Sequence, residues 1–291
     1  MIKTPRLALV ERVATQVIRE HKITCLPICP FSIANARGII VQGKSAGAPG
    51  CSGMLLRVGN SFGIMYSTDI ENRGFQRFSV AHELGHYFLP DHPEQVLQHG
   101  AHVSRAGFAS HDPYEREADF FAGALLLPKS LIRPLVARFP EGMDGMIELA
   151  QSCETSLTST AIAYAQTSSA AVAVILSDNG AVKFCFMSDA MKRARLGWIG
   201  KRERIPLRSL TEKVSRAHSR VDVPVSEDTD LQDWFASDHS HPAREEVLSL
   251  RCAEELLTVL YSERLSLADD ADEDSKEEAD LIDRWTPRFR R

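Results

Sequence analysis

The sequence lacks long apolar runs and regularly spaced cysteines. Within its 291 residues, no stretch approaches the roughly 18 consecutive apolar residues of a membrane-spanning helix. Charges run through the first 25 residues, unlike a secretory signal peptide. The six cysteines are irregularly spaced, and Cys25 and Cys29 are too far apart for a C-x-x-C pair. We therefore expect a cytoplasmic protein with no membrane segment and no disulfide framework.

What the sequence has is the composition of a folded globular protein. Apolar residues make up 44% and charged residues 25% of the chain, with a formal net charge of −5. The length is comfortable for two domains, each with a buried core.

The most informative stretch is the H-E-L-G-H sequence at 82–86. Asn72 is a natural cap for a helix through this segment. At about 3.6 residues per turn, His82 and His86 share one face, where both can bind a single Zn²⁺. Glu83 lies about 100° around the helix from His82, so it can reach a water at the metal without being a ligand. The spacing predicts a metal-assisted hydrolase.

A third ligand is expected from a second helix. Asp112 is a natural N-cap for a helix over about residues 113–126. On that helix Glu115 and Asp119 lie one turn apart, so Glu115 is a candidate ligand and Asp119 a candidate acceptor for the N–H of a zinc-bound histidine. Alternatively, Glu115 only completes a capping box with Asp112. Glu117 faces another way, and we expect it to be solvated.

His92 is the alternative third ligand, because its distance from His82 matches the metzincin spacing. That motif requires a glycine after the second histidine, whereas this chain has Leu89 and Pro90 there, and a residue before proline favours extended geometry. We therefore favour Glu115. Other histidines of this region are expected to be exposed or at the mouth of the site: His99, His102 and His111.

Three segments carry a family resemblance: the H-E-L-G-H helix, the E-R-E-A-D-F-F-A-x-x-L-L-L-P segment after it, and the upstream L-P-I-C-P-F-S-I-A-N-A-R-G-I. They resemble the ImmA/IrrE family of gluzincin-like metallopeptidases over about residues 1–135. The resemblance implies that His82, His86 and Glu115 bind zinc and that Glu83 is the general base. It also implies a helix-turn-helix repressor as the substrate, cut at a single site, in systems that respond to DNA damage or phage.

Two further patterns lie in and after this region. Residues 53–68 read as a hairpin with a turn at 59–61. In gluzincin-like sites such a strand binds the substrate backbone by β-augmentation, although an ordinary sheet hairpin has the same pattern.

Residues 143–167 have the apolar periodicity of two short helices. A DNA-binding helix-turn-helix is disfavoured because residues 159–166 contain no Lys or Arg.

The C-terminal part begins with a predicted hairpin over 171–187, turning at 178–180. Residues 192–220 then contain ten Lys or Arg against two acids. With Trp198, the cations Lys201, Arg202 and Arg204 are candidates for a single-stranded nucleic-acid surface. A solvated face partly paired with acidic residues is the alternative. Residues 269–283 hold nine acids and one Lys, which predicts a tether.

These patterns predict an α+β protein with a zinc-peptidase domain over 1–138, a helical connector over 139–168, a smaller α+β sensor or regulatory domain over 169–262 and an acidic tail over 263–291. The predicted function is a zinc endopeptidase that cleaves a helix-turn-helix repressor, with single-stranded DNA as a candidate activator. Alternatives are a non-peptidase sensor with a structural zinc, and a transcription factor using 143–167. An inhibitory cysteine thiolate at the zinc is a further possibility that the sequence assigns to no residue. Candidates for stabilising the oxyanion are Tyr66, His111 and Tyr114.

Overall fold

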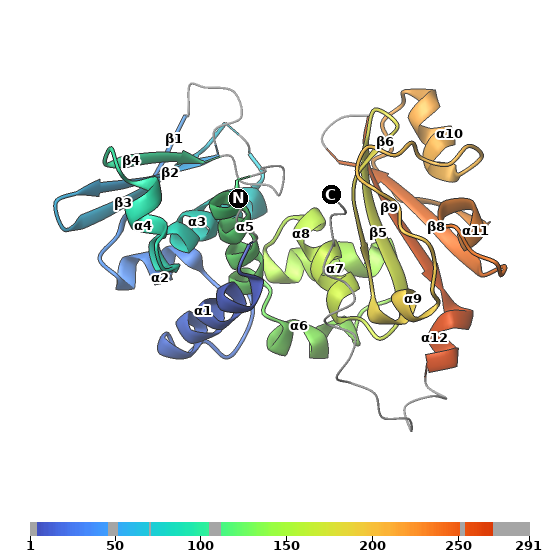
Figure 1. Ribbon diagram of the computed structural model, residues 1–291, viewed down its shortest axis with the longest axis horizontal. Helices are drawn as coiled ribbons and strands as arrows, with labels where there is room; N and C mark the ends of the chain where they lie inside the picture. Colours follow the sequence, from blue (N-terminus) through green and yellow to red (C-terminus); the bar gives the residue numbers. More distant parts are fainter. Residues whose placement is uncertain (1–4, 46–51, 70, 105–111, 251–253, 270–291) are drawn as a thin grey trace, which may run out of the picture. The chain divides into compact units, whose positions relative to one another are not determined.

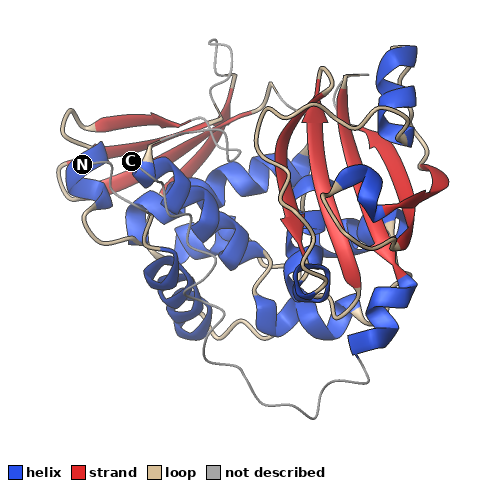
Figure 2. Ribbon diagram, turned by 45° about the vertical axis from the view of Figure 1, so that its right-hand side comes forward, coloured by secondary structure: helices blue, strands red, loops and turns tan. Residues whose placement is uncertain are grey.

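The computed structural model describes residues 5–45, 52–69, 71–104, 112–250 and 254–269. The chain divides into two compact units, Met1–Ser168 and Ser169–Arg291. Each unit combines helices with one β-sheet, so the predicted α+β class is confirmed (Figures 1 and 2). Among the described residues, no helix is long and apolar enough to cross a membrane.

The first unit contains a four-stranded sheet, formed by β1 (Ile40–Lys44), β2 (Gly53–Val58), β3 (Ser61–Ser67) and β4 (Ala101–Ser104). Its strand order is β1-β3-β2-β4, in which only β1 and β3 are parallel. The predicted hairpin is confirmed as β2 and β3. Both of its strands are interior, however, because β1 and β4 pair with its two sides. The strand order therefore favours the alternative of an ordinary sheet hairpin, and β4 is the edge strand next to β2.

Eight helices of the first unit are described: α1 (Leu7–Glu20), α2 (Pro30–Ala36), α3 (Arg73–Phe88), α4 (His92–Val96), α5 (Pro113–Leu126), α6 (Lys129–Val136), α7 (Met143–Cys153) and α8 (Leu157–Thr167). The two helices that matter most begin at the predicted caps. The Asn72 side chain accepts a hydrogen bond from Phe75 N at 3.0 Å, and Asp112 accepts one from Tyr114 N at 2.9 Å. Helix α3 ends where Leu89 becomes extended before Pro90.

Helix α3 packs against β2 and β3 on one side and against α5 on the other (Figure 1). Gly85 permits the close approach of α5, because a Cβ atom at this position would lie 3.1 Å from Ala118 Cα and 3.2 Å from the Phe121 ring. Phe121 and Ala118 are fully buried. This contact brings the predicted third ligand on α5 next to the two histidines of α3.

Helices α7 and α8 belong to the same unit and pack on the start of α3. A Cβ atom on Gly74 would lie 2.5 Å from the backbone of Thr155, in the turn between the two helices. Arg77 of α3 is buried and forms an ion pair with Glu154 in that turn at 2.8 Å. Helix α8 itself buries residues along its length, including Thr160. A helix held in this way is poorly placed to enter a DNA groove, which disfavours the transcription-factor alternative.

The second unit is built on a five-stranded antiparallel sheet of order β6-β5-β9-β8-β7. Its strands are β5 (Ala171–Asp178), β6 (Ala181–Met187), β7 (Val225–Asp230), β8 (Pro242–Ser249) and β9 (Glu255–Ser262), and its described helices are α9 (Asp189–Arg193), α10 (Leu210–Ala217), α11 (Leu231–Trp234) and α12 (Glu263–Asp269). The predicted hairpin is confirmed as β5 and β6. Its two turn residues, Asn179 and Gly180, both have positive φ, as a tight hairpin turn requires.

The contact between α3 and α5 yields a stability prediction. Phe121→Ala should lower the free energy of unfolding by about 3–5 kcal/mol, because it removes a fully buried ring between the two helices. Phe120→Ala, at the neighbouring half-buried position, is the matched control and should cost about 1 kcal/mol. Urea denaturation measures both. Equal losses would contradict the placement of Phe121 in this interface.

Candidate metal centre

Helices α3 and α5 bring three predicted metal ligands together. His82 Nε2 lies 3.1 Å from His86 Nε2, and Glu115 places Oε2 3.5 Å from His82 Nε2 and Oε1 3.1 Å from His86 Nε2. All three side chains are buried, and their donor atoms form a group within 4.8 Å. Two imidazoles and one carboxylate at this spacing are a donor set that suits Zn²⁺ and leaves a coordination position for water or substrate.

Asp119, one turn after Glu115, supports the first of these histidines. Its Oδ1 atom lies 2.8 Å from His82 Nδ1, and both side chains are buried. When the carboxylate accepts the Nδ1–H, the Nε2 lone pair of His82 points into the donor group, which is the tautomer that a metal ligand needs.

The electrostatics of the donor group favour a positive charge. Burial acts to lower the pKa of His82, but hydrogen bonds with Asp119 and Glu115 outweigh it and raise the pKa to about 10. Burial lowers the pKa of the neighbouring His86 to about 3. Burial acts to raise the pKa of Glu115, but hydrogen bonds with His102, His82 and His86 hold it well below its ordinary value. The carboxylates around His82 stabilise a positive charge there, and a divalent cation would benefit from the same carboxylates.

Glu83 lies beside the donor group and is left without a partner. Both of its carboxylate oxygens are buried and accept no hydrogen bond from a described residue. Burial raises the pKa of Glu83 to about 7, against the opposing charge of His82, and the Ser104 hydroxyl also acts to lower it without meeting hydrogen-bond geometry. An unpartnered buried carboxylate is costly, and a water held at a metal would satisfy it. The residues present therefore fit a bound metal ion.

Gly53 on β2 makes room for that carboxylate. A Cβ atom at this position would lie 2.6 Å from Glu83 Oε1 and 3.2 Å from Glu83 Cγ. Any other residue would therefore press on the Glu83 side chain. No sequence signal marked this glycine, because the contact joins a strand to a helix far along the chain.

One expectation about a neighbouring residue needs correction, whereas the preference for Glu115 over His92 agrees with the donor group. Glu117 was expected to be solvated, but only 3% of it is exposed, and it bonds to Arg6 and to His92. The rival ligand His92 is fully buried and contacts His86 through Nδ1, at 3.1 Å, on the nitrogen that faces away from the donor group. Glu117 is buried because the chain after α3 folds back towards α5 and α1 and brings His92 and Arg6 to its carboxylate. The spacing of residues along one helix cannot predict these contacts.

His102 contacts a candidate ligand, which its position in the sequence did not indicate. It lies on the edge strand β4, its Nε2 atom is 2.7 Å from Glu115 Oε1, and its ring centroid is 4.7 Å from that of His86. With 21% of its side chain exposed, it sits at the mouth of the site, as expected for this group of histidines. His99 is exposed, and His111 lies outside the described residues.

The rings of the two tyrosines considered for the oxyanion each pack against another aromatic ring. Tyr114 packs edge-on against His92, with ring centroids 5.0 Å apart, and Tyr66 packs against Phe31 at 5.5 Å. His102, by contrast, contacts the donor group directly through Glu115.

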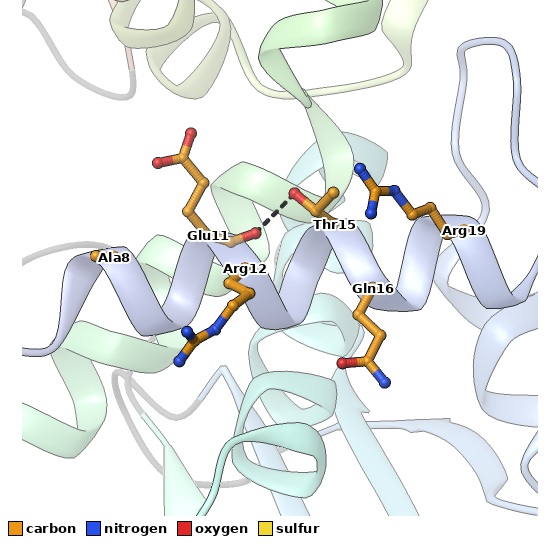
Figure 3. A pocket seen from close by; sticks show the side chains of 6 residues that line it. All are labelled: Ala8, Glu11, Arg12, Thr15, Gln16 and Arg19. Carbon is orange, nitrogen blue, oxygen red and sulfur yellow. Dashed lines mark hydrogen bonds between the residues drawn. The ribbon is translucent and has the colours of Figure 1, made fainter.

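Other candidate features lie apart from this centre. The cysteines that the structure describes, Cys25, Cys29, Cys153 and Cys185, do not belong to the donor group. Figure 3 shows a hollow on one exposed face of α1, lined by Ala8, Glu11, Arg12, Thr15, Gln16 and Arg19. These side chains include none of the metal-site residues, and the hollow gathers no buried polar group.

The candidate nucleic-acid residues lie in the second unit, in the loop between α9 and α10. Residues 202–205 pair with the start of β6, through Arg202 N to Val182 O at 2.7 Å and Ile205 N to Gly180 O at 3.1 Å. Ile205 is buried, whereas Trp198 is 60% exposed. The side chains of Lys201, Arg202 and Arg204 are exposed and form no ion pair with a described residue. The cations nearer the ends of the basic run are paired: Lys192 with Asp189, Lys213 with Glu227 and Arg216 with Glu212.

The fold and the donor set are those of a domain in which an H-E-x-x-H helix and a downstream glutamate could hold a metal ion. Residues 60–163 match the family model of the IrrE N-terminal-like domain of peptidase family M78, in agreement with the family resemblance. A solved structure described as a Mycobacterium tuberculosis transcriptional regulator is similar in fold, with a TM-score of 0.58 and 11% sequence identity over 89% of this chain and 78% of that one. No curated protein gives a significant match.

The donor group predicts the outcome of a metal titration. Glu115→Ala should abolish stoichiometric Zn²⁺ binding, because it removes one of three converging ligands. Arg116→Ala changes an exposed residue on the same helix and should bind zinc as the unsubstituted protein does. Atomic absorption after dialysis measures both. A full zinc content in Glu115→Ala would show that the third ligand lies elsewhere.

Proposed function

We propose that this protein is a zinc-dependent endopeptidase that cleaves a helix-turn-helix transcriptional repressor at a single site, and so derepresses genes for stress response or phage defence. The observation that carries the catalytic part is the position of Glu83, a buried and unpartnered carboxylate beside a group of two imidazoles and Glu115. The repressor substrate rests on the resemblance to the ImmA/IrrE family and on the IrrE N-terminal-like domain.

In this proposal His82, His86 and Glu115 would hold Zn²⁺, which would supply Lewis acidity towards the scissile carbonyl and acidify the attacking water. Glu83 accepts the proton of that water on a carboxylate oxygen and delivers it to the leaving amine. Gly53 keeps the space in which Glu83 can move between these two tasks. Asp119 fixes His82 in the ligand tautomer.

The substrate would enter along β4. This edge strand carries His102 into the mouth of the site, and an extended peptide can pair with an edge strand through its backbone. In this arrangement His102 faces the scissile peptide and donates a hydrogen bond to the oxygen that becomes negative. That role replaces the tyrosines considered from the sequence.

A non-peptidase sensor with a structural zinc is the alternative function. Structural zinc sites are normally closed by four protein ligands and need no carboxylate facing the metal. The donor group among the described residues has three ligands, with Glu83 beside them. This arrangement favours the peptidase.

The catalytic proposal is tested with Glu83→Gln. The amide keeps the shape of the side chain but cannot accept the proton, so cleavage of the cognate repressor should fall by at least about 10²-fold while zinc stays bound. Glu94→Gln, an exposed position on α4, is the matched control and should leave the rate unchanged. Mass spectrometry of the repressor fragments gives the rate and the cleavage site. Unchanged cleavage by Glu83→Gln would exclude this residue as the base.

We also propose that single-stranded DNA stimulates the enzyme through the loop of Lys201, Arg202 and Arg204. Three exposed cations without acidic partners among the described residues, close in sequence to the exposed ring of Trp198, offer phosphate contacts and a stacking surface. The acidic run at 269–283, which would shield this surface in the resting state, lies outside the described residues beyond Asp269.

Charge reversal tests this surface. Replacing Lys201, Arg202 and Arg204 by Glu should abolish DNA stimulation and leave the zinc content unchanged. For the unsubstituted protein, log affinity should fall with log salt by about 0.7 for each phosphate contact. Reversal of three exposed cations of the first unit, Arg12, Arg19 and Lys22, changes the net charge equally and is the control. If both triple variants bind single-stranded DNA alike, the loop is only a solvated face.

A further inference from the structure

A continuous chain of contacts, buried from Glu117 onwards, runs from the residue before α1 to the second histidine of the candidate metal site. Arg6 donates to Glu117 from its backbone N at 2.8 Å and from its guanidinium at 2.9 Å. Glu117 Oε2 lies 3.0 Å from His92 Nε2, and His92 Nδ1 lies 3.1 Å from His86 Nδ1. His92 and His86 are fully buried and Glu117 is 3% exposed. The metal-site function does not otherwise use Arg6, Glu117 or His92.

The hydrogen-bond chemistry fixes the direction of this chain. Arg6 can only donate, so the carboxylate of Glu117 acts as an acceptor towards it and towards His92. His92 must then carry its proton on Nε2, which leaves Nδ1 as the acceptor for the Nδ1–H of His86. The remaining nitrogen of His86, Nε2, keeps its lone pair towards His82 and Glu115. The chain therefore sets His86 in the tautomer that a metal ligand requires.

We propose that His92 is a positioning residue for His86, and that Arg6 and Glu117 anchor it. This inference rests on the proposed metal-binding role of His86. The Nδ1–H of His82 donates directly to the carboxylate of Asp119, whereas the Nδ1–H of His86 donates to the imidazole of His92, which in turn contacts a carboxylate. An acceptor on the far nitrogen holds the ring orientation and raises the basicity of a metal-bound histidine.

The surroundings of His92 hold it in place for this task. Arg6 also bonds to Asp91 at 3.0 Å and to Pro90 O at 3.1 Å, so it fixes the chain just before His92. The ring of Tyr114 packs edge-on against the His92 ring. The segment after α3 is thereby tied both to α1 and to α5, and its histidine has a defined position behind the metal site.

The tautomer can be observed without metal or substrate. In zinc-free protein labelled with ¹⁵N-histidine, long-range ¹H–¹⁵N spectra should show His86 protonated on Nδ1. His92→Phe removes the acceptor and should abolish this signature. His92→Gln should preserve it, because the amide oxygen can accept from His86 and the amide nitrogen can donate to Glu117. His99→Phe changes an exposed histidine of the same region and is the control.

Zinc affinity, measured by competition with a chromogenic chelator, gives the second readout. His92→Phe should weaken binding by roughly tenfold or more, with recovery in His92→Gln. Glu117→Gln keeps the shape of the carboxylate and should also weaken binding. In the His92→Phe background the same change should add little, because both act through one chain. Denaturation of each variant separates loss of folding from loss of affinity.

The outcomes separate this inference from the proposed function. If His92→Phe binds zinc as the unsubstituted protein does and His86 keeps its tautomer, the positioning role is wrong while the peptidase proposal stands. Additive effects of Glu117→Gln and His92→Phe would likewise overturn the chain. If the unsubstituted protein binds no zinc, yet the His86 tautomer changes in His92→Phe, the chain is supported and the metal-site function fails.

Discussion

The candidate site depends on the close contact between helices α3 and α5. Gly85 lets the two backbones approach, and the buried Phe121 fills the space beside it. Because of this contact, the face of α3 that carries the two histidines meets the face of α5 that carries Glu115 and Asp119. A side chain at Gly85 would press on Ala118 and Phe121 and push α5 away from α3. Metal ligands tolerate only a few tenths of an ångström of such misplacement. The rest of the first unit holds this pair of helices: the sheet on one side of α3, and the turn between α7 and α8 at its start.

The rings of His82 and His86 are both oriented by an acceptor at Nδ1, but the acceptors differ. One is oriented by a carboxylate on the neighbouring helix, which local helical spacing can provide. The other depends on a histidine in the segment after α3 and on an arginine at the beginning of α1. The start of the chain is thus part of the support of the site, although it is far from the H-E-L-G-H sequence. A change near Arg6 would reach the donor group through Glu117 and His92 without touching a ligand.

Sequence reasoning succeeded where local physics decides the structure. Caps at Asn72 and Asp112, the stop before Pro90 and the turn at Asn179 and Gly180 each follow from neighbouring residues, and the structure has these elements where they were predicted. The sequence did not predict features that depend on contacts between segments far apart in the chain. The burial of Glu117, the strand order that makes β4 the edge and the place of His102 depend on contacts between distant segments, which no periodicity encodes. Gly53 is the clearest case, because its importance appears only once Glu83 lies against it.

The buried carboxylates of α3 and α5 give a physical reason to propose a metal ion in the first unit. Four carboxylates of two adjacent helices are buried: Glu83, Glu115, Glu117 and Asp119. Burying a charge is unfavourable unless it is paired. Arg6 and His92 pair Glu117, and His82 pairs Asp119. Glu115 is then shared among three histidines, and Glu83 has no hydrogen-bond partner in the part of the chain that the structure describes. A divalent cation held by the proposed ligands would compensate both remaining acids at once. Under the proposed function, metal binding and folding of the first unit would therefore be coupled.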